Sequence, residues 1–262
     1  MFIPFHDDNP TQRPPVVTYA LVAINVAVFL WAGRLPEVSE QVLVYQHGFV
    51  PARIIQLSQP HPIFIPVDVP VHDPFWGERI ERRAIELAPV PRQIWLSLLT
   101  CMFLHGSWMH LLGNMWFLWL FGNNVEDRLG PLLYLVLYLV GGLIASGVHW
   151  RVDPASTMPV IGASGAIAAV LGAYAVTWPW ARVSTLVFLV VFVTIVEVPA
   201  LVVLGVWFLA QVLAGQQSLG AAASGGVAWW AHVGGFLAGM ALMPLLIAVA
   251  GGTKNEEDTI AN

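Results

Sequence analysis

Apolar residues occur along this chain in long unbroken runs. The runs occupy residues 16–32, 109–122, 132–148, 160–177 and 228–250, with a further apolar stretch at 184–213. A helix needs about 20 mostly apolar residues to cross a lipid bilayer. The pattern therefore predicts membrane-spanning helices. The second run is short, and we extend it upstream through residues 95–104.

The stretch 184–213 differs from the other runs because it contains Glu197 and Pro199. Two crossings with a turn would need about 40 residues, so the stretch crosses only once. Its first half is rich in β-branched and aromatic residues, which favour an extended or interfacial segment. Proline suits the first turn of a helix. We place the span at about 199–213, which gives six spans.

The runs lie within one predicted membrane domain, residues 16–250. We expect a cytoplasmic N-terminal segment at 1–15 and a disordered tail at 251–262. The first loop, residues 33–92, contains short apolar pieces such as 62–70 that we expect in the membrane interface. An even number of spans puts both termini on one side, and the basic residues of the short loops favour the cytoplasm for that side. We expect a multi-pass protein of the inner (plasma) membrane.

Composition supports a membrane protein. The chain is 57% hydrophobic and 10% charged, against roughly 25% charged residues in soluble domains. Its single cysteine, Cys101, can form no internal disulfide. The net charge of −5 and the absence of a basic run argue against nucleic acid as a partner. The sequence contains no HExxH motif, and His105 and His110 are five residues apart, which argues against zinc.

A small-residue motif, GASG at 162–165, lies near the start of the fourth predicted span and contains Ser164. Gly162 and Gly165 flank the serine and permit close approach of another backbone or of a substrate. Small residues also serve helix packing in membranes, so the motif alone leaves both interpretations open.

A histidine, His232, lies near the start of the sixth predicted span. Histidine inside a span is a functional candidate, with a structural hydrogen bond as the alternative. The fourth and sixth spans start from the same side of the membrane, so we expect Ser164 and His232 at matching depth, each about five residues into its span. Gly235 and Gly239 would let the two spans pack closely. A serine beside an imidazole is an activated nucleophile, here a dyad without a carboxylate.

Two further polar residues, His110 and Asn114, are four residues apart in the second predicted span and share one helical face. Both side chains can donate hydrogen bonds to an oxyanion. A polar clamp between helices is the alternative interpretation.

Four segments together identify a known family. FLHGSWMHLLGNM at 103–115, FGNNVEDRLG at 121–130, GASG at 162–165 and AHVGG at 231–235 occur in that order. In this order they resemble the rhomboid intramembrane proteases of the bacterial six-span type. The resemblance covers residues from about 9 to 246.

The resemblance implies a fold and a site. The fold is an all-α bundle of six transmembrane helices with a long, partly embedded first loop. Ser164 is then the nucleophile and His232 the general base, while His110, Asn114 and the backbone N–H of Ser164 stabilise the oxyanion. Substrates are transmembrane segments of other proteins in the lipid bilayer, with Gly162 and Gly165 beside the cleaved bond. No metal, nucleotide or other cofactor is implied, and no oligomeric state.

The resemblance also places residues outside the site. Glu126 and Arg128 match a structural motif, and His105 matches a histidine outside the catalytic set. Many members carry an aromatic residue against the catalytic histidine at the position that is Ala168 here. Trp116, Trp229 and Trp230 are the candidates to replace that ring.

Two other function classes remain as alternatives. An inactive rhomboid-like protein that binds membrane clients is expected to lack the serine or the histidine, and both are present here. A transporter or channel is expected to show paired repeats, and we find none.

Overall fold

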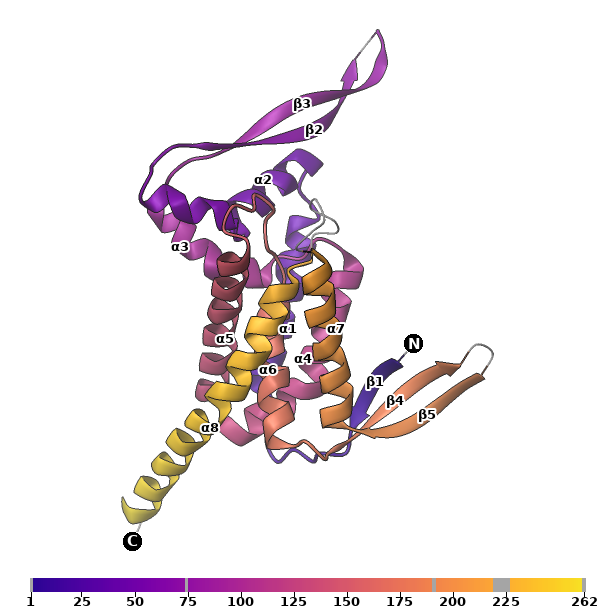
Figure 1. Ribbon diagram of the computed structural model, residues 1–262, viewed down its shortest axis with the longest axis vertical. Coiled ribbons are helices and arrows are strands. Elements are labelled where there is room, and N and C mark those ends of the chain that lie inside the picture. Colours follow the sequence, from indigo (N-terminus) through magenta and orange to yellow (C-terminus); the bar gives the residue numbers. More distant parts are fainter. Residues whose placement is uncertain (1, 74, 190–191, 219–226, 261–262) are drawn as a thin grey trace.

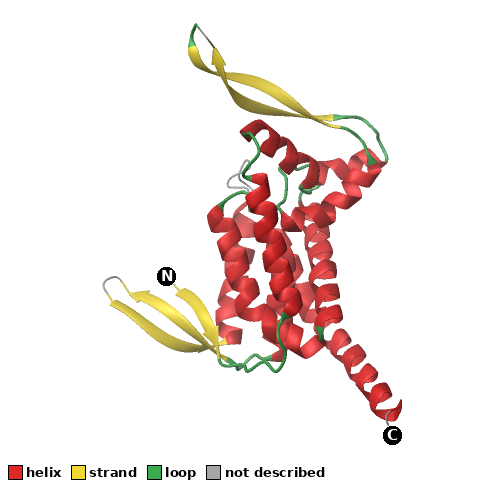
Figure 2. Cartoon of the chain, turned by 180° about the vertical axis from the view of Figure 1, so that it is seen from behind, coloured by secondary structure: helices red, strands yellow, loops and turns green. Residues whose placement is uncertain are grey.

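The helices of the chain pack side by side, with one small sheet beyond one end of the bundle and another beside the opposite end (Figure 1, Figure 2). The computed structural model describes residues 2–73, 75–189, 192–218 and 227–260. Its α-helices are α1 (Val16–Ala32), α2 (Glu37–His47), α3 (Pro91–Thr100), α4 (Trp108–Leu129), α5 (Pro131–Val152), α6 (Ser164–Thr177), α7 (Ala200–Ser218) and α8 (Trp229–Ile260). Two 3₁₀ helices, η1 (Pro51–Leu57) and η2 (Cys101–Phe103), lie in the first half of the chain.

The predicted helical membrane bundle is confirmed. Helices α1, α4, α5, α6, α7 and α8 correspond to the six predicted spans. Three of them, α5, α7 and the part of α8 at Trp229–Gly251, are long and apolar enough to cross a membrane by themselves. Helices α1 and α6 are apolar but shorter. The count of six crossings therefore stays a prediction.

The upstream extension of the second span is bent. Residues 95–103 belong to α3 and η2, which meet α4 at an angle of 79°. Together the two segments are long and apolar enough for one broken span or a re-entrant loop, so their joint crossing stays a prediction. The chain turns because a new helix starts at Trp108, where the Ser107 hydroxyl accepts a hydrogen bond from the backbone N–H of His110. This N-cap satisfies one of the free N–H groups of the first turn of α4.

The stretch 184–213 has the predicted two parts. Strands β4 (Arg182–Leu189) and β5 (Phe192–Pro199) form an antiparallel pair, and α7 begins directly afterwards. The N-terminal segment adds a strand that we did not predict, β1 (Phe2–Asp7), so that the sheet order is β1-β4-β5. The carboxylate of Asp7 is buried there and accepts a hydrogen bond of 2.6 Å from the hydroxyl of Tyr174 on α6.

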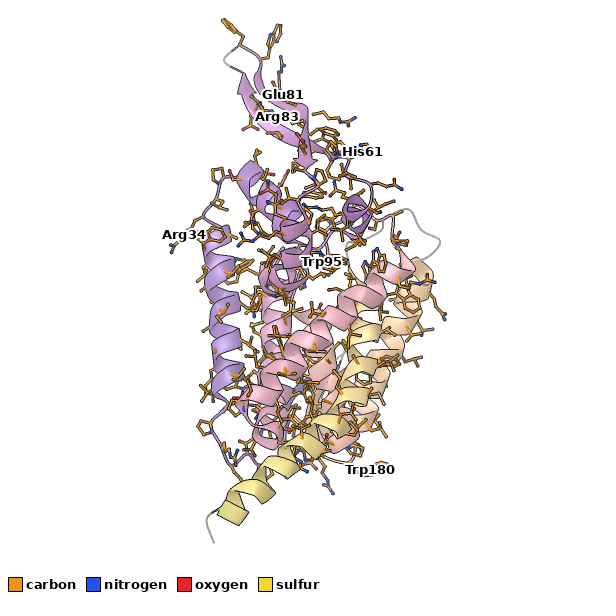
Figure 3. All side chains as sticks on the ribbon, turned by 90° about the vertical axis from the view of Figure 1, so that its left-hand side faces the viewer. Arg34, His61, Glu81, Arg83, Trp95 and Trp180 are labelled. Carbon is orange, nitrogen blue, oxygen red and sulfur yellow. The ribbon has the colours of Figure 1, made fainter. Side chains whose placement is uncertain are left out.

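The first loop is largely structured. Residues 63–70, part of a piece that we expected in the membrane interface, lie in strand β2 (Ile63–Asp73), which pairs along its whole length with β3 (Gly77–Leu87). Their place relative to a membrane stays a prediction. The base of this hairpin buries Ile65, Ile85 and Leu87 against one another. Its far part, which carries Glu81 and Arg83, extends away from the helices (Figure 3). Hydrogen bonds to β3 satisfy the backbone N–H and C=O groups of β2, and alternate side chains of β2 face the buried cluster. The two effects together explain why this segment is a strand.

The C-terminal residues also differ from the prediction. We expected a disordered tail from residue 251, whereas α8 runs to Ile260. The segment contains no proline, and Lys254, Glu256 and Glu257 are good helix formers, although Gly251 and Gly252 are residues that often end a helix.

Two exposed tryptophans mark the ends of the bundle. Trp95 on α3 is 57% exposed at one end, and Trp180, between α6 and β4, is 74% exposed at the other (Figure 3). Indole rings favour the two interfaces of a bilayer. The two tryptophans therefore fit the two interfaces of a bilayer whose apolar layer surrounds the helices that lie between Trp95 and Trp180.

A buried carboxylate joins α1 to α4. Glu126 accepts hydrogen bonds of 2.8 Å from the backbone N–H groups of Val17 and Thr18 and from the Thr18 hydroxyl. Negative charge at a helix N-terminus is favourable, because the first N–H groups have no partner within the helix. Glu126 thus caps α1, in agreement with a structural role.

Helix α6 lies at the centre of the bundle and touches α8 backbone to backbone. A Cβ atom at Gly235 would overlap the carbonyl oxygen of Gly165, and one at Gly239 would overlap that of Ala169. On α6, a Cβ atom at Gly172 would overlap the carbonyl oxygen of Phe236. The close contact predicted from Gly235 and Gly239 is confirmed.

Replacing Gly239 by leucine should therefore lower stability and activity together. The new side chain would have to push α8 away from Ala169, and overpacking of this kind costs about 1–3 kcal/mol or more. Thermal unfolding in detergent measures the effect. The matched control is Gly205→Leu on α7, where no atom lies within 4 Å of an added Cβ. A Gly239→Leu protein as stable and active as the Gly205→Leu control would contradict the close contact.

Candidate active site

The serine of the GASG motif is the first residue of α6. Gly162 has φ +115°, which favours glycine, and its N–H donates a 2.9 Å hydrogen bond to the carbonyl of Cys101. Just before it, Val160 pairs with Phe49 of the first loop. These contacts keep residues 160–163 out of the helix. Ser164 is thus not five residues into a helix, as we expected from the apolar run.

The histidine of the AHVGG motif faces that serine. His232 is the fourth residue of α8, and the Ser164 hydroxyl lies 2.8 Å from its Nε2 atom. The glycine contacts between α6 and α8 bring the two helices close enough for this bond. The structure therefore brings together the two residues that the sequence paired, and both are partly buried.

The other ring nitrogen of His232 has a partner that we did not predict. Its Nδ1 atom lies 2.7 Å from the side-chain oxygen of Gln211 on α7. Gln211 is only 8% exposed. A polar residue within an apolar run was the available signal, but glutamine does not titrate and the run does not show which side of its helix meets His232.

Two aromatic rings flank the same imidazole. Trp207 of α7 lies with its ring centroid 6.0 Å from that of His232, and Trp229 meets it edge-on at 6.1 Å. Trp229 was one of the predicted candidates, whereas Trp207 was not. The indole N–H of Trp116 donates a hydrogen bond to the backbone oxygen of Pro4. Pro4 lies in strand β1, at the end of the bundle opposite to Ser164. The indole of Trp116 is therefore not beside His232.

The two predicted oxyanion donors lie against the loop before Ser164. A Cβ atom at Gly162 would be 2.5 Å from Nε2 of His110 and 3.4 Å from Nδ2 of Asn114. The side-chain amide of Asn114 also donates a hydrogen bond of 2.9 Å to Nε2 of buried His105. This bond uses one of its two amide hydrogens. His105, which the resemblance placed outside the catalytic set, therefore orients Asn114.

The two glycines that flank the serine have different surroundings. Gly162 faces His110 and Asn114, as described above. At Gly165 an added Cβ would be 2.8 Å from the Cβ of Ala145 on α5. The missing side chain of Gly165 thus serves helix packing, and a contact of either glycine with substrate stays a prediction.

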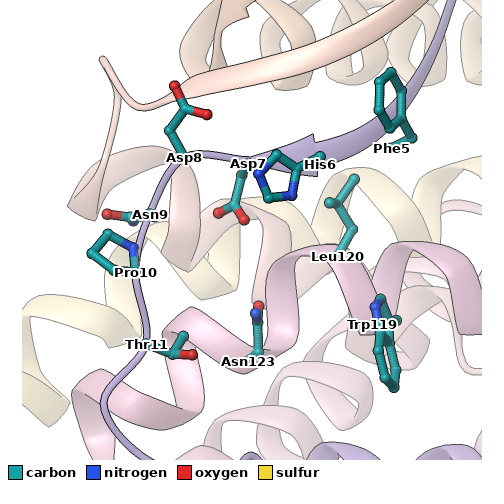
Figure 4. A pocket seen from close by; sticks show the side chains of 10 residues that line it. All are labelled: Phe5, His6, Asp7, Asp8, Asn9, Pro10, Thr11, Trp119, Leu120 and Asn123. Atoms are coloured by element: carbon teal, nitrogen blue, oxygen red, sulfur yellow. The ribbon is translucent and has the colours of Figure 1, made fainter.

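Two cavities differ in their relation to these residues. The cavity that includes Ser164, Gly162 and Cys101 in its lining has a volume of about 10 Å³, roughly what one water molecule needs. A larger cavity of about 520 Å³ lies near β1 at the opposite end of the bundle, lined by residues that include Asp7, Trp119 and Asn123 (Figure 4). Neither Ser164 nor His232 lines it. Within the described part of the chain, no group of three or more His, Cys, Asp or Glu side chains is placed to hold a metal.

Comparison with known proteins gives one family. The model of the rhomboid domain matches residues 91–249. The chain is 35% identical over 95 residues to rhomboid-like protein 11, chloroplastic, of Arabidopsis thaliana, covering 34% of this chain and 32% of that protein. It is 34% identical over 96 residues to presenilin-associated rhomboid-like protein A, mitochondrial, of Danio rerio, covering 36% of this chain and 25% of that protein. The chain thus spans about a third or less of the length of these relatives.

Proposed function

Because the chain belongs to the rhomboid family, we propose that it is an intramembrane serine endopeptidase that cuts transmembrane helices of other membrane proteins. The observation that carries the proposal is the 2.8 Å contact between the Ser164 hydroxyl and Nε2 of His232. A serine within hydrogen-bond reach of an imidazole is the arrangement of an activated nucleophile.

The proposed reaction has two steps. Ser164 Oγ attacks the carbonyl carbon of the substrate while His232 Nε2 takes the hydroxyl proton. The C–N bond then breaks, and the imidazolium gives that proton to the leaving amine. A water molecule hydrolyses the acyl-enzyme with His232 again as the base, which frees the new carboxyl group and restores the serine. The chemistry needs no metal or cofactor.

The negative charge on the attacked oxygen needs donors. The N–H of Ser164 is in the first turn of α6, where backbone N–H groups have no partner within the helix. His110 Nε2 and Asn114 Nδ2 lie against Gly162, next to that N–H. These three groups form the proposed oxyanion site. The dipole of α6 points its positive end at the same place.

We also propose the bacterial six-span topology, in a plasma membrane with cytoplasmic termini. In support, strand β1 and the C-terminal end of α8 lie at the end of the bundle opposite to the hairpin β2–β3 (Figure 1). The N-terminal ends of α6 and α8, which carry Ser164 and His232, lie toward the hairpin. The site would then open to the extracytoplasmic face, and water would enter from there.

A membrane-bound substrate must reach Ser164 sideways from the bilayer. Its peptide bonds are hidden in helical hydrogen bonds, so the helix has to unwind before attack. Glycine and proline lower the cost of unwinding by about 1 and 3 kcal/mol each relative to alanine. We therefore expect faster cleavage of a single-span helix with a Gly or Pro pair in its outer half than of a matched all-leucine helix.

The test compares the two helices in liposomes that contain the purified protein, and mass mapping of the products locates the cut. A helix with the same pair in its inner half is the control, and it should be cut slowly. Equal rates for all three helices, or cuts in the cytoplasmic half, would refute the side of access and the unwinding step. Binding of the helices without any product would favour the inactive, client-binding alternative.

A further inference from the structure

The imidazole of His232 is held between two helices. Its Nε2 atom faces Ser164 on α6, and its Nδ1 atom lies 2.7 Å from Oε1 of Gln211 on α7. Trp207, which flanks the same ring, is four residues before Gln211 and so lies on the same face of α7. Helix α7 thus supplies both a polar and an aromatic contact to the candidate base.

The polar contact determines which nitrogen carries the proton. An amide oxygen can only accept a hydrogen bond, so Nδ1 of His232 is the donor to Gln211. In a neutral imidazole the other nitrogen then has the free lone pair, which faces the Ser164 hydroxyl. This is the tautomer that a general base needs. In the best-known serine proteases a buried carboxylate selects it.

A carboxylate does not take that place here. Within the described residues, the two ring nitrogens of His232 contact Ser164 and Gln211, and neither partner is an acid. An amide oxygen provides the same directed acceptor without the charge. Burying an unpaired ion in an apolar bundle is costly, so a neutral acceptor suits this site. A carboxylate at the same position would be paired with the imidazole of His232 and could also accept from Nδ1.

We propose that Gln211 is the positioning residue of the base, so that Ser164, His232 and Gln211 form a triad spread over α6, α8 and α7. The inference rests on the proposed function. Gln211 acts through His232 and does not touch the substrate. Because the bond joins α7 to α8, Ser164 is fully activated only while α7 is packed against α8 at this level.

The experiment replaces Gln211 by methionine, which has a similar length but no strong acceptor, and by glutamate, which restores an acceptor oxygen. Gln216→Met is the matched control, because Gln216 is exposed on the same helix. Two rates are measured with the full chain in detergent. One is the modification of Ser164 by a small fluorophosphonate, in which the Oγ–P bond forms, fluoride leaves and Nε2 takes the hydroxyl proton. The other is cleavage of a single-span helix, resolved into kcat and KM.

A buried donor left without its partner costs about 1–3 kcal/mol, or roughly 5- to 150-fold in rate. Gln211→Met should therefore slow labelling and lower kcat by about 10- to 100-fold while KM changes less than about twofold. Gln211→Glu should recover most of both rates, and Gln216→Met should match the unmodified protein. A structural role would not produce recovery by glutamate together with an unchanged KM.

The inference is overturned if Gln211→Met labels at the rate of the unmodified protein, or if Gln211→Glu is as slow as Gln211→Met. If the methionine variant fails to fold, Gln211→Leu provides a second side chain without an acceptor. In that case the glutamate variant must still be labelled at Ser164 at close to the rate of the unmodified protein. If the unmodified protein neither labels at Ser164 nor cuts any helix, the proposed function itself is wrong. That outcome is distinct from a failure at Gln211 alone.

Discussion

Replacing Ser164 by alanine should abolish cleavage of membrane-embedded helices, and His232→Ala should do the same. Without the hydroxyl no acyl-enzyme can form, and without the imidazole the hydroxyl loses the proton acceptor that lies 2.8 Å away. Loss of either member of such a pair costs about 10⁴-fold or more in soluble serine proteases. Turnover of a purified single-span substrate in detergent, followed by mass spectrometry, measures the loss.

The matched control for the serine is Ser97→Ala on α3. Ser97 is another buried serine, but its hydroxyl only donates to the backbone oxygen of Ile94. Ser164→Ala should keep the thermal stability of the original protein, because the Ser164–His232 bond is only partly buried. His232→Ala should still fold but melt at a lower temperature, because it also removes the partner of buried Gln211. A variant of either residue with near-normal turnover would show that the reaction does not use this dyad.

The second large effect is expected at the oxyanion donors. Removing one such donor costs about 10²–10³-fold in kcat in a soluble protease. The double variant His110→Ala, Asn114→Ala loses two donors and keeps the backbone N–H of Ser164, so we expect a loss of at least about 10²-fold in kcat. Cleavage kinetics of a single-span helix measure the loss, and Asn114→Ala alone should already lower turnover clearly.

Asn123→Ala is the control for these variants, because Asn123 lies on the same helix α4 but near its other end, at the larger cavity. Its turnover should be unchanged. Asn114→Ala should leave labelling by a small probe nearly unchanged, because the Ser164–His232 contact persists. If the double variant cleaves as fast as the Asn123→Ala control, the two side chains do not stabilise an oxyanion.

The helices could be predicted where local signals mark their ends. Helix α1 has the predicted bounds because Pro14 and Pro15 precede it and Gly33 follows it. Helix α7 begins at Ala200, one residue after the predicted start, because Pro199 ends strand β5 and does not enter the first turn of the helix. The bend between α3 and α4 was missed because both segments are apolar. The local signals between them are limited to Gly106 and the Ser107 cap in the short loop 104–107.

The sheets were harder to predict because their pairing is long-range. Strand β1 pairs with β4 about 180 residues later in the chain, and no local pattern announces such a partner. In strand β2 the prolines 66 and 70 concealed the alternation, since proline is confined to edge strands. The hairpin β2–β3 has two strands, so each of them is an edge and tolerates proline.

The candidate site divides in the same way. Ser164 and His232 stood out as polar residues within apolar runs, and the glycine spacing predicted the helix contact that joins them. Gln211 and Trp207 were not predicted, because their role depends on the position of α7 relative to His232. That position follows from tertiary packing, which no spacing along the chain encodes.

The central claim is that His232 activates Ser164, and selective labelling tests it most directly. The protein in detergent is incubated with a fluorophosphonate probe, and the modified residue is located by peptide mass mapping. We predict that the probe modifies Ser164 and no other serine, and that His232→Ala removes the labelling while Ser97→Ala leaves it intact. Absence of labelling at Ser164 in the folded protein, or equal labelling in the His232→Ala variant, would contradict the account.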